Sequence, residues 1–185
     1  MIKQWVATIC AVSLLVGGPV WAKTDPALEQ VKSELLKHKH STKKRLLWVS
    51  GHARKNLINL ATNRRETNTV RVRAIQALAG FQDKGTFRVL RELIFNPIEP
   101  RPVRAAAMEV LGEFHNTQVV GILKQFVLSD NPDFRLNAAR GLERQGSEEA
   151  CGILLQALSR EQDLTIKEGL DRLFNMCKAH QRGEK

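Results

Sequence analysis

The chain contains no tyrosine, and only 5% of its 185 residues are aromatic. Alternating runs of valine, isoleucine and threonine, which are typical of half-buried strands, are also lacking. These two absences argue against a fold built on a β-sheet. The sequence does contain 43% hydrophobic residues, enough for one domain with its own core, and residues that favour helices dominate it.

Motifs that carry catalysis are lacking as well. The sequence has no glycine-rich phosphate loop, no paired-carboxylate motif and no recognisable serine–histidine–aspartate grouping. The histidines do not suit a metal site, since His38 and His40 are two residues apart and would point to different sides of a helix, and the other three stand alone. We therefore expect no enzyme activity, no metal and no cofactor.

The first 22 residues have the layout of a secretory signal peptide. Lys3 supplies a positive charge, residues 5–16 form an apolar stretch, and Gly17–Pro19 end it shortly before Ala22. We predict cleavage after Ala22 and a periplasmic or secreted protein of the bacterial cell envelope. An uncleaved membrane anchor is the alternative, although the apolar stretch is shorter than the roughly 20 residues that span a bilayer.

Positive charge is concentrated in one part of the chain. Without residues 1–22 the sequence keeps 28 basic and 19 acidic residues, a net charge of +9. Residues 23–73 hold 13 basic and four acidic residues, which is also +9, whereas residues 74–185 hold 15 of each. A region of this kind suits an anionic surface, such as lipid headgroups or an acidic polymer. Nucleic acid, the usual partner of a basic patch, is disfavoured by the expected export.

Comparison of the sequence with itself reveals a repeat. An apolar residue followed by arginine, with alanine three positions after the arginine and leucine seven positions after it, occurs at Arg71, Arg104 and Arg135. A weaker fourth copy begins at Ile166. A second apolar pattern recurs in phase at residues 86–90, 119–123 and 150–154. Both patterns have the helical period, and neither helix can bury its apolar side without a neighbouring unit, so the sequence predicts an all-α solenoid of antiparallel helix pairs.

The cores Val70–Leu78 and Val103–Leu111, with Phe134–Leu142 close behind, resemble the short HEAT-like repeats of bacterial proteins, the type first associated with phycobilisome lyases. The resemblance covers roughly residues 69–177. It implies a right-handed stack of helix pairs that serves protein interactions, and it carries no set of catalytic residues.

We accordingly divide the chain into four regions. They are the signal peptide (1–22), a basic, divergent N-terminal helical pair (23–68), about 3.5 repeats ending in a capping helix (69–179), and a polar tail (180–185). The second helix of the basic pair carries an apolar stripe, with Gly51 as the expected position of a bend. The stripe is formed by Leu46, Ser50, Ala53, Leu57 and Leu60.

The inner surface of a solenoid is the usual partner site of this architecture. If the apolar stripes of the second helices face the core, the opposite sides of these helices form that surface. Its candidate residues are Arg88, Arg91, Glu92, Phe95, Gly121, Lys124, Gln125, Leu128, Gly152, Leu155 and Gln156. Glycine inside a helix costs about 1 kcal/mol relative to alanine, so either close helix packing or the close approach of a partner should compensate at Gly121 and Gly152. We expect a protein partner, whose identity the sequence does not reveal.

The candidate contacts to an anionic surface are Lys43, Lys44, Trp48, Arg54, Lys55 and Arg65. Positions 11 residues apart on one continuous helix fall within about 20° of each other, which would place Lys43, Arg54 and Arg65 on the same side. A basic face that is simply solvated is the alternative.

The repeated arginines Arg71, Arg104 and Arg135 are interpreted as a structural ladder that ties one unit to the next through helix carbonyls and aspartates between repeats. Asp130 and Asp133 are the candidate partners of the third arginine. An anion-binding ladder is the alternative interpretation.

Two cysteines, Cys151 and Cys177, remain after cleavage, and an oxidising compartment would allow a disulfide between them. Counting from a turn near residues 160–162 places Cys151 opposite residue 172, about 7 Å short of Cys177 along the helix. This count slightly favours two free thiols.

Overall fold

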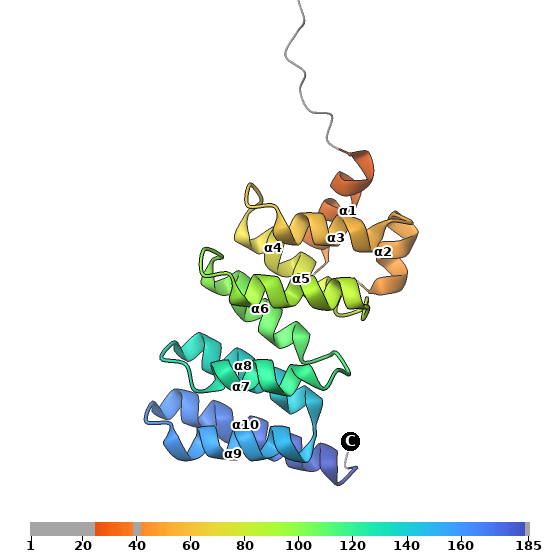
Figure 1. Cartoon of the computed structure of the whole chain (residues 1–185). Helices are drawn as coiled ribbons and strands as arrows, with labels where there is room; N and C mark the ends of the chain where they lie inside the picture. The colour runs from red at the N-terminus through yellow and green to blue at the C-terminus, as the bar shows by residue number, and fades with distance from the viewer. Residues whose placement is uncertain (1–24, 39–41, 184–185) are drawn as a thin grey trace, which may run out of the picture.

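The computed structural model describes residues 25–38 and 42–183 (Figure 1). This part of the chain forms ten α-helices and contains no strand, so the all-α prediction is confirmed. The helices are α1 (Pro26–Lys37), α2 (Lys43–Val49), α3 (Ala53–Thr62), α4 (Asn68–Leu78), α5 (Lys84–Phe95), α6 (Arg101–Leu111), α7 (Gln118–Val127), α8 (Pro132–Gln145), α9 (Glu148–Arg160) and α10 (Leu164–Gln181). The predicted signal peptide lies outside the described residues.

Helices α4 to α10 form a stack of helix pairs, α4/α5, α6/α7 and α8/α9, closed by α10 (Figure 1). The first helices of successive units pack closely, α4 on α6, α6 on α8, and α8 on α10. The second helices form the other row, in which α7 touches α9 only sparingly. The fold is therefore an α-solenoid, and α10, which contacts both α8 and α9, covers the last pair as a single helix.

Short polar side chains at the helix starts explain where most of these helices begin. Thr67, Asp83, Asn131, Ser147 and Asp163 each accept a hydrogen bond from a backbone N–H in the first turn that follows. Such N-caps satisfy donors that have no partner inside the helix. The loops between the units therefore end at defined residues, which fixes the register of the stack.

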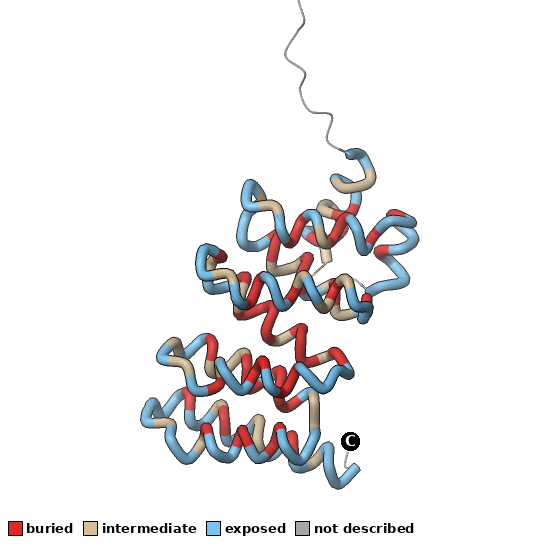
Figure 2. Tube along the Cα trace, in the orientation of Figure 1, coloured by how far each residue is buried: buried red, intermediate tan, exposed pale blue. Residues whose placement is uncertain are grey.

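The repeated alanines and leucines form the core that runs along the first helices. Ala74, Ala107, Ala138, Leu78, Leu111 and Leu142 are all completely buried. Figure 2 shows the same arrangement, with buried and exposed residues alternating along each helix of the stack. Small alanines allow the first helices to approach, while the leucines fill the space beneath them.

Two glycines bring the second and third units into backbone contact. A Cβ atom on Gly112, at the end of α6, would lie 2.4 Å from the Cα of Gly141 in α8. A Cβ on Gly141 would lie 2.8 Å from the carbonyl oxygen of Met108. No other residue type fits at these positions without separating α6 from α8.

The N-terminal region contains three helices instead of the predicted pair, because the expected second helix is interrupted between α2 and α3. Ser50 ends α2 in an extended conformation, and its hydroxyl accepts hydrogen bonds from the backbone N–H of His52 and the side-chain amide of Asn56, both at 3.2 Å. These bonds stabilise the break before α3 begins at Ala53. The predicted apolar stripe Leu46, Ser50, Ala53, Leu57 and Leu60 is nevertheless buried throughout.

Cys151 and Cys177 form a disulfide that joins α9 to α10, with Cα atoms 5.7 Å apart. The residue count that favoured free thiols was wrong. Cys151 lies nine residues before the end of α9 and Cys177 lies 13 residues after the start of α10, a difference of about 6 Å along the helix axis. Glu161 and Asp163 in the connecting loop are extended, and extended residues advance about twice as far as helical ones, so α10 can start beyond the end of α9.

Candidate interaction surfaces

The candidate residues on α5, α7 and α9 share one exposed surface, which we call the second-helix face. All 11 are exposed, while the apolar stripes of the same helices point into the core, as the helical period predicts. We name the surface by its helices, since they form the more widely spaced row of the stack.

Three large apolar side chains on the second-helix face are exposed to solvent. Phe95, Leu128 and Leu155 expose 42%, 41% and 49% of their surface, respectively. Phe95 also packs at 5.5 Å, ring centre to ring centre, against Phe126 of α7, which links the first two units. The apolar surface available for contact is therefore spread over three consecutive units.

Gly121 in α7 and Gly152 in α9 occupy equivalent positions on this face. Both are exposed, and no atom of the described residues lies within 4 Å of the position that a Cβ would take on either glycine. Close helix packing, one of the two explanations considered for these glycines, is therefore wrong. The backbone of α7 and α9 is open to an approaching partner at these two points.

The charges on the second-helix face are mixed. Arg88 and Glu92 form an exposed pair one helical turn apart, with 3.8 Å between nitrogen and oxygen, and Arg91 and Lys124 are exposed. Exposed pairs of this type contribute little to stability, so these side chains are free to contact a partner at low cost.

The arginine ladder has a structural role. In each unit the arginine donates a hydrogen bond to a backbone carbonyl at the end of the preceding second helix or just beyond it. Arg71 bonds the Ala61 carbonyl at 2.9 Å, Arg104 bonds that of Ile94 at 2.8 Å, and Arg135 bonds that of Ser129 at 2.9 Å. Carbonyls at this end of a helix lack partners within the helix and carry its negative partial charge, so arginine stabilises them.

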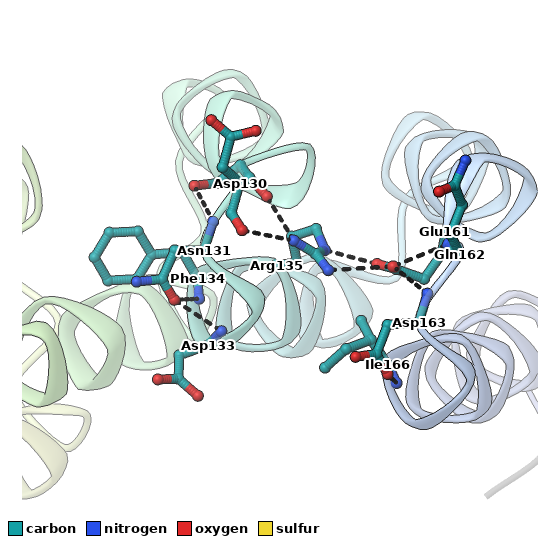
Figure 3. Close-up of polar contacts among 10 residues, drawn as sticks. Asp130, Asn131, Asp133, Phe134, Arg135, Glu161, Gln162, Asp163 and Ile166 are labelled. Carbon is teal, nitrogen blue, oxygen red and sulfur yellow. Dashed lines mark hydrogen bonds and ion pairs between the residues drawn. The ribbon is translucent and has the colours of Figure 1, made fainter.

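Glutamates from the next loop along the stack complete two steps of the ladder. Arg71 pairs with the buried Glu99, and Arg135 forms two bonds to Glu161, at 2.6 and 3.1 Å (Figure 3). Arg104 has a different neighbour, because its guanidinium lies 4.6 Å from the centre of the Phe134 ring. Each arginine thus connects its own unit to the one before it and to the one after it.

The expected partners of Arg135 were wrong in chemistry. Asp130 contributes its backbone carbonyl at 3.1 Å, and no contact of its carboxylate or that of Asp133 with Arg135 is found. Asp133 is exposed in the first turn of α8, only two residues before Arg135, whereas Glu161 reaches the guanidinium from the next unit (Figure 3). The glutamates follow their arginines by 28 and 26 residues, a recurrence in the loops that the sequence comparison did not use.

Two buried carboxylates have pKa values shifted in opposite directions. Burial raises the pKa of Glu161, but the hydrogen bonds from Arg135 and from the amides of Asp163 and Gln162 outweigh it, so the pKa is lowered overall. The pKa of Glu143 in α8 is raised, because burial outweighs the neighbouring charges of His180 and Arg144. Glu161 is therefore held in its charged form, whereas Glu143 is pushed towards its neutral form.

The six basic and aromatic candidates of the N-terminal region are all exposed, but they do not form one helical face. The break before α3 removes the continuous helix on which the 11-residue spacing depends. Lys43 lies 5.2 Å from the centre of the Phe81 ring, and Arg54 pairs with Asp83 at 3.1 Å, so both hold the N-terminal helices against the α4–α5 loop. Lys44, Lys55 and Arg65 make no ion pair with the described residues.

Within the described ranges, no helix is both long enough and apolar enough to cross a bilayer. The same residues contain no group of three or more histidine, cysteine, aspartate or glutamate side chains that could hold a metal ion.

Comparison with known proteins supports the repeat architecture. A family model described as HEAT repeats matches residues 98–170, which span most of α6 to α9 and the start of α10. HEAT repeats commonly mediate protein–protein interactions. No curated protein matches the chain.

Proposed function

We propose that the protein is a non-catalytic interaction module of the cell envelope that binds a protein partner through the second-helix face. The observation that carries the proposal is the pair Gly121 and Gly152. Each costs its helix about 1 kcal/mol relative to alanine, and no packing within the described residues accounts for either glycine. A partner whose atoms lie against the bare backbone of α7 and α9 would give both glycines a reason.

The surroundings of the two glycines support a protein as that partner. Leu128 and Leu155 are exposed close by in the chain, and Lys124 and Gln125 lie one helical turn from Gly121. Protein interfaces combine an apolar centre with a polar rim in this way.

The test is quantitative cross-linking and capture from the native envelope with a Gly121→Ala/Gly152→Ala variant. Alanine fits both positions without contact, so the variant keeps the fold, and any loss of capture reports on the surface alone. We expect the specifically captured proteins to fall at least severalfold, and a Leu155→Ala variant to show the same loss.

Gln76→Ala, an exposed substitution on α4 in the first-helix row, is the matched control and should leave capture unchanged. Capture that is identical for the wild-type, glycine and leucine variants would exclude the second-helix face as the binding surface.

The envelope location depends on the predicted signal peptide. Determination of the N-terminus of the protein purified from cells should give Lys23 as the first residue. A protein that begins at Met1 and fractionates with the cytosol would overturn the location without affecting the proposed surface.

A further inference from the structure

Helix α2 divides its side chains between packing and solvent. Leu46 is completely buried, Arg45 pairs with Glu34 of α1, and Lys43 lies over Phe81. These contacts use one side of the helix to hold it on α1 and on the α4–α5 loop.

The other side of α2 presents Lys44, Leu47 and Trp48, which we call the α2 patch. Residues three and four positions apart share a helix face, and here Lys44 lies between the leucine and the tryptophan. Trp48 exposes 88% of its surface and Leu47 exposes 42%. The patch thus joins a large aromatic ring, an aliphatic side chain and a cation on one short helix.

The charges around the α2 patch are not compensated. Residues 23–73 contain nine more basic than acidic residues, and the described carboxylates of this region are mostly in use elsewhere. Glu34 pairs with Arg45, and Glu66 pairs with Lys32 at 2.9 Å. Lys44 and Lys55 therefore have no carboxylate within ion-pair distance among the described residues.

We propose that the α2 patch docks the protein on an anionic lipid bilayer surface. Tryptophan is enriched at the level of the headgroups because its ring is apolar and its N–H is polar. Leucine enters the outer acyl region, and lysines near the surface are attracted to anionic lipids by about 1 kcal/mol each. The uncompensated charge selects an anionic surface over a neutral one, and this surface is separate from the second-helix face.

The sequence provides a direct probe of this contact. Trp5, Trp21 and Trp48 are the three tryptophans of the chain, so a Trp5→Phe/Trp21→Phe variant leaves Trp48 as the only one, whether or not residues 1–22 are removed. The test adds vesicles of phosphatidylcholine alone, or of phosphatidylcholine with phosphatidylglycerol, to this protein. Anionic vesicles should shift the Trp48 emission to shorter wavelength and protect it from iodide, and the neutral vesicles should not.

Cosedimentation with the same vesicles measures the strength of the contact. We expect Trp48→Ala to lower partitioning about tenfold, from the loss of one large apolar side chain, and Lys44→Gln to lower it about fivefold. Raising the salt concentration should weaken binding further, since exposed charges are screened. Leu155→Ala is the matched control on the second-helix face and should leave partitioning unchanged.

Equal emission shifts with neutral and anionic vesicles, or none with either, would overturn the proposal. Protection of Trp48 only when a captured protein is present would assign the α2 patch to a protein partner instead. Loss of vesicle binding in Trp48→Ala with unchanged protein capture would separate this proposal from the second-helix face.

Discussion

Two pairs of glycines in the same two units have opposite surroundings. Gly112 and Gly141 lie where α6 meets α8, and added Cβ atoms would enter the backbone of the neighbouring helix. Gly121 and Gly152 lie in α7 and α9, where nothing described lies within 4 Å of such atoms. The fold explains the first pair and leaves the second pair unexplained. The row of first helices is thus a closed packing surface, and the row of second helices is an open one.

Gly112→Ala tests the closed row and should have the largest effect. The atoms that the new methyl would meet, at 2.4 to 2.8 Å, belong to the Gly141 backbone and cannot rotate away. We expect a loss of about 3 kcal/mol or more in the free energy of unfolding, or a fall of about 6–12 °C in Tm.

Thermal and urea denaturation followed by circular dichroism measure this change. Gly51→Ala is the matched control, because nothing lies within 4 Å of its Cβ position, and its stability should stay within about 0.5 kcal/mol of wild type. If both variants unfold together with wild type, α6 and α8 are not in backbone contact.

The disulfide is the next largest effect, since it attaches the capping helix of the closed row. A Cys151→Ala/Cys177→Ala variant should lose about 2–3 kcal/mol in the free energy of unfolding, measured by urea denaturation. Thiol labelling in denaturant without reductant should find no free thiol if residues 1–22 are removed, and one, from Cys10, if they are retained. Two additional thiols would show that the bond does not form.

The comparison also shows how far the sequence could predict the fold. The repeat at Arg71, Arg104 and Arg135 predicted the stack, because a recurring apolar period has one geometric solution when every unit lacks a complete core. The exposed side of the second helices followed from the same period. By contrast, the break after Ser50 depends on hydrogen bonds made by its own hydroxyl, and the helical period continues across it unchanged.

The site was less predictable, because its features depend on distances between units. Gly112 and Gly121 look alike in the sequence, yet one lies against a neighbouring backbone and the other faces solvent. The partner of Arg135 is Glu161, 26 residues away, which spacing within one unit cannot identify. The position of Cys177 opposite Cys151 depends on the extended loop between α9 and α10.

The carboxylates Glu161 and Glu143, both attached to the closed row, should respond to pH in opposite ways. The lowered pKa of Glu161 means that its contribution to stability is present above the unfolded value of about 4.3 and is lost as the pH falls through the lowered pKa. The raised pKa of Glu143 means that its contribution is present below that value and is lost as the pH rises through the raised pKa.

Urea denaturation of Glu161→Gln and Glu143→Gln from pH 3 to pH 7 measures both responses. Glu161→Gln should lose about 1–2 kcal/mol at pH 7, because it removes a charge-assisted pair, and the difference from wild type should shrink below pH 4.3. Glu143→Gln should gain relative to wild type as the pH rises from 4 to 7. Parallel pH curves for the two variants would contradict the opposite environments of these carboxylates.

Gly121→Ala and Gly152→Ala test the open row and should have the smallest effect on stability, with the opposite sign to Gly112→Ala. Alanine favours the helix and meets no atom at either position, so each substitution should raise the free energy of unfolding by about 0.5–1 kcal/mol. Urea denaturation of the single and double variants measures the gain, which should be additive because the two glycines lie in different helices. A loss of stability would mean that the surface is closed in solution, as at Gly112. A gain in stability joined to a loss of partner capture would mean that these glycines serve binding at the expense of the fold, which is the distinction between the two rows.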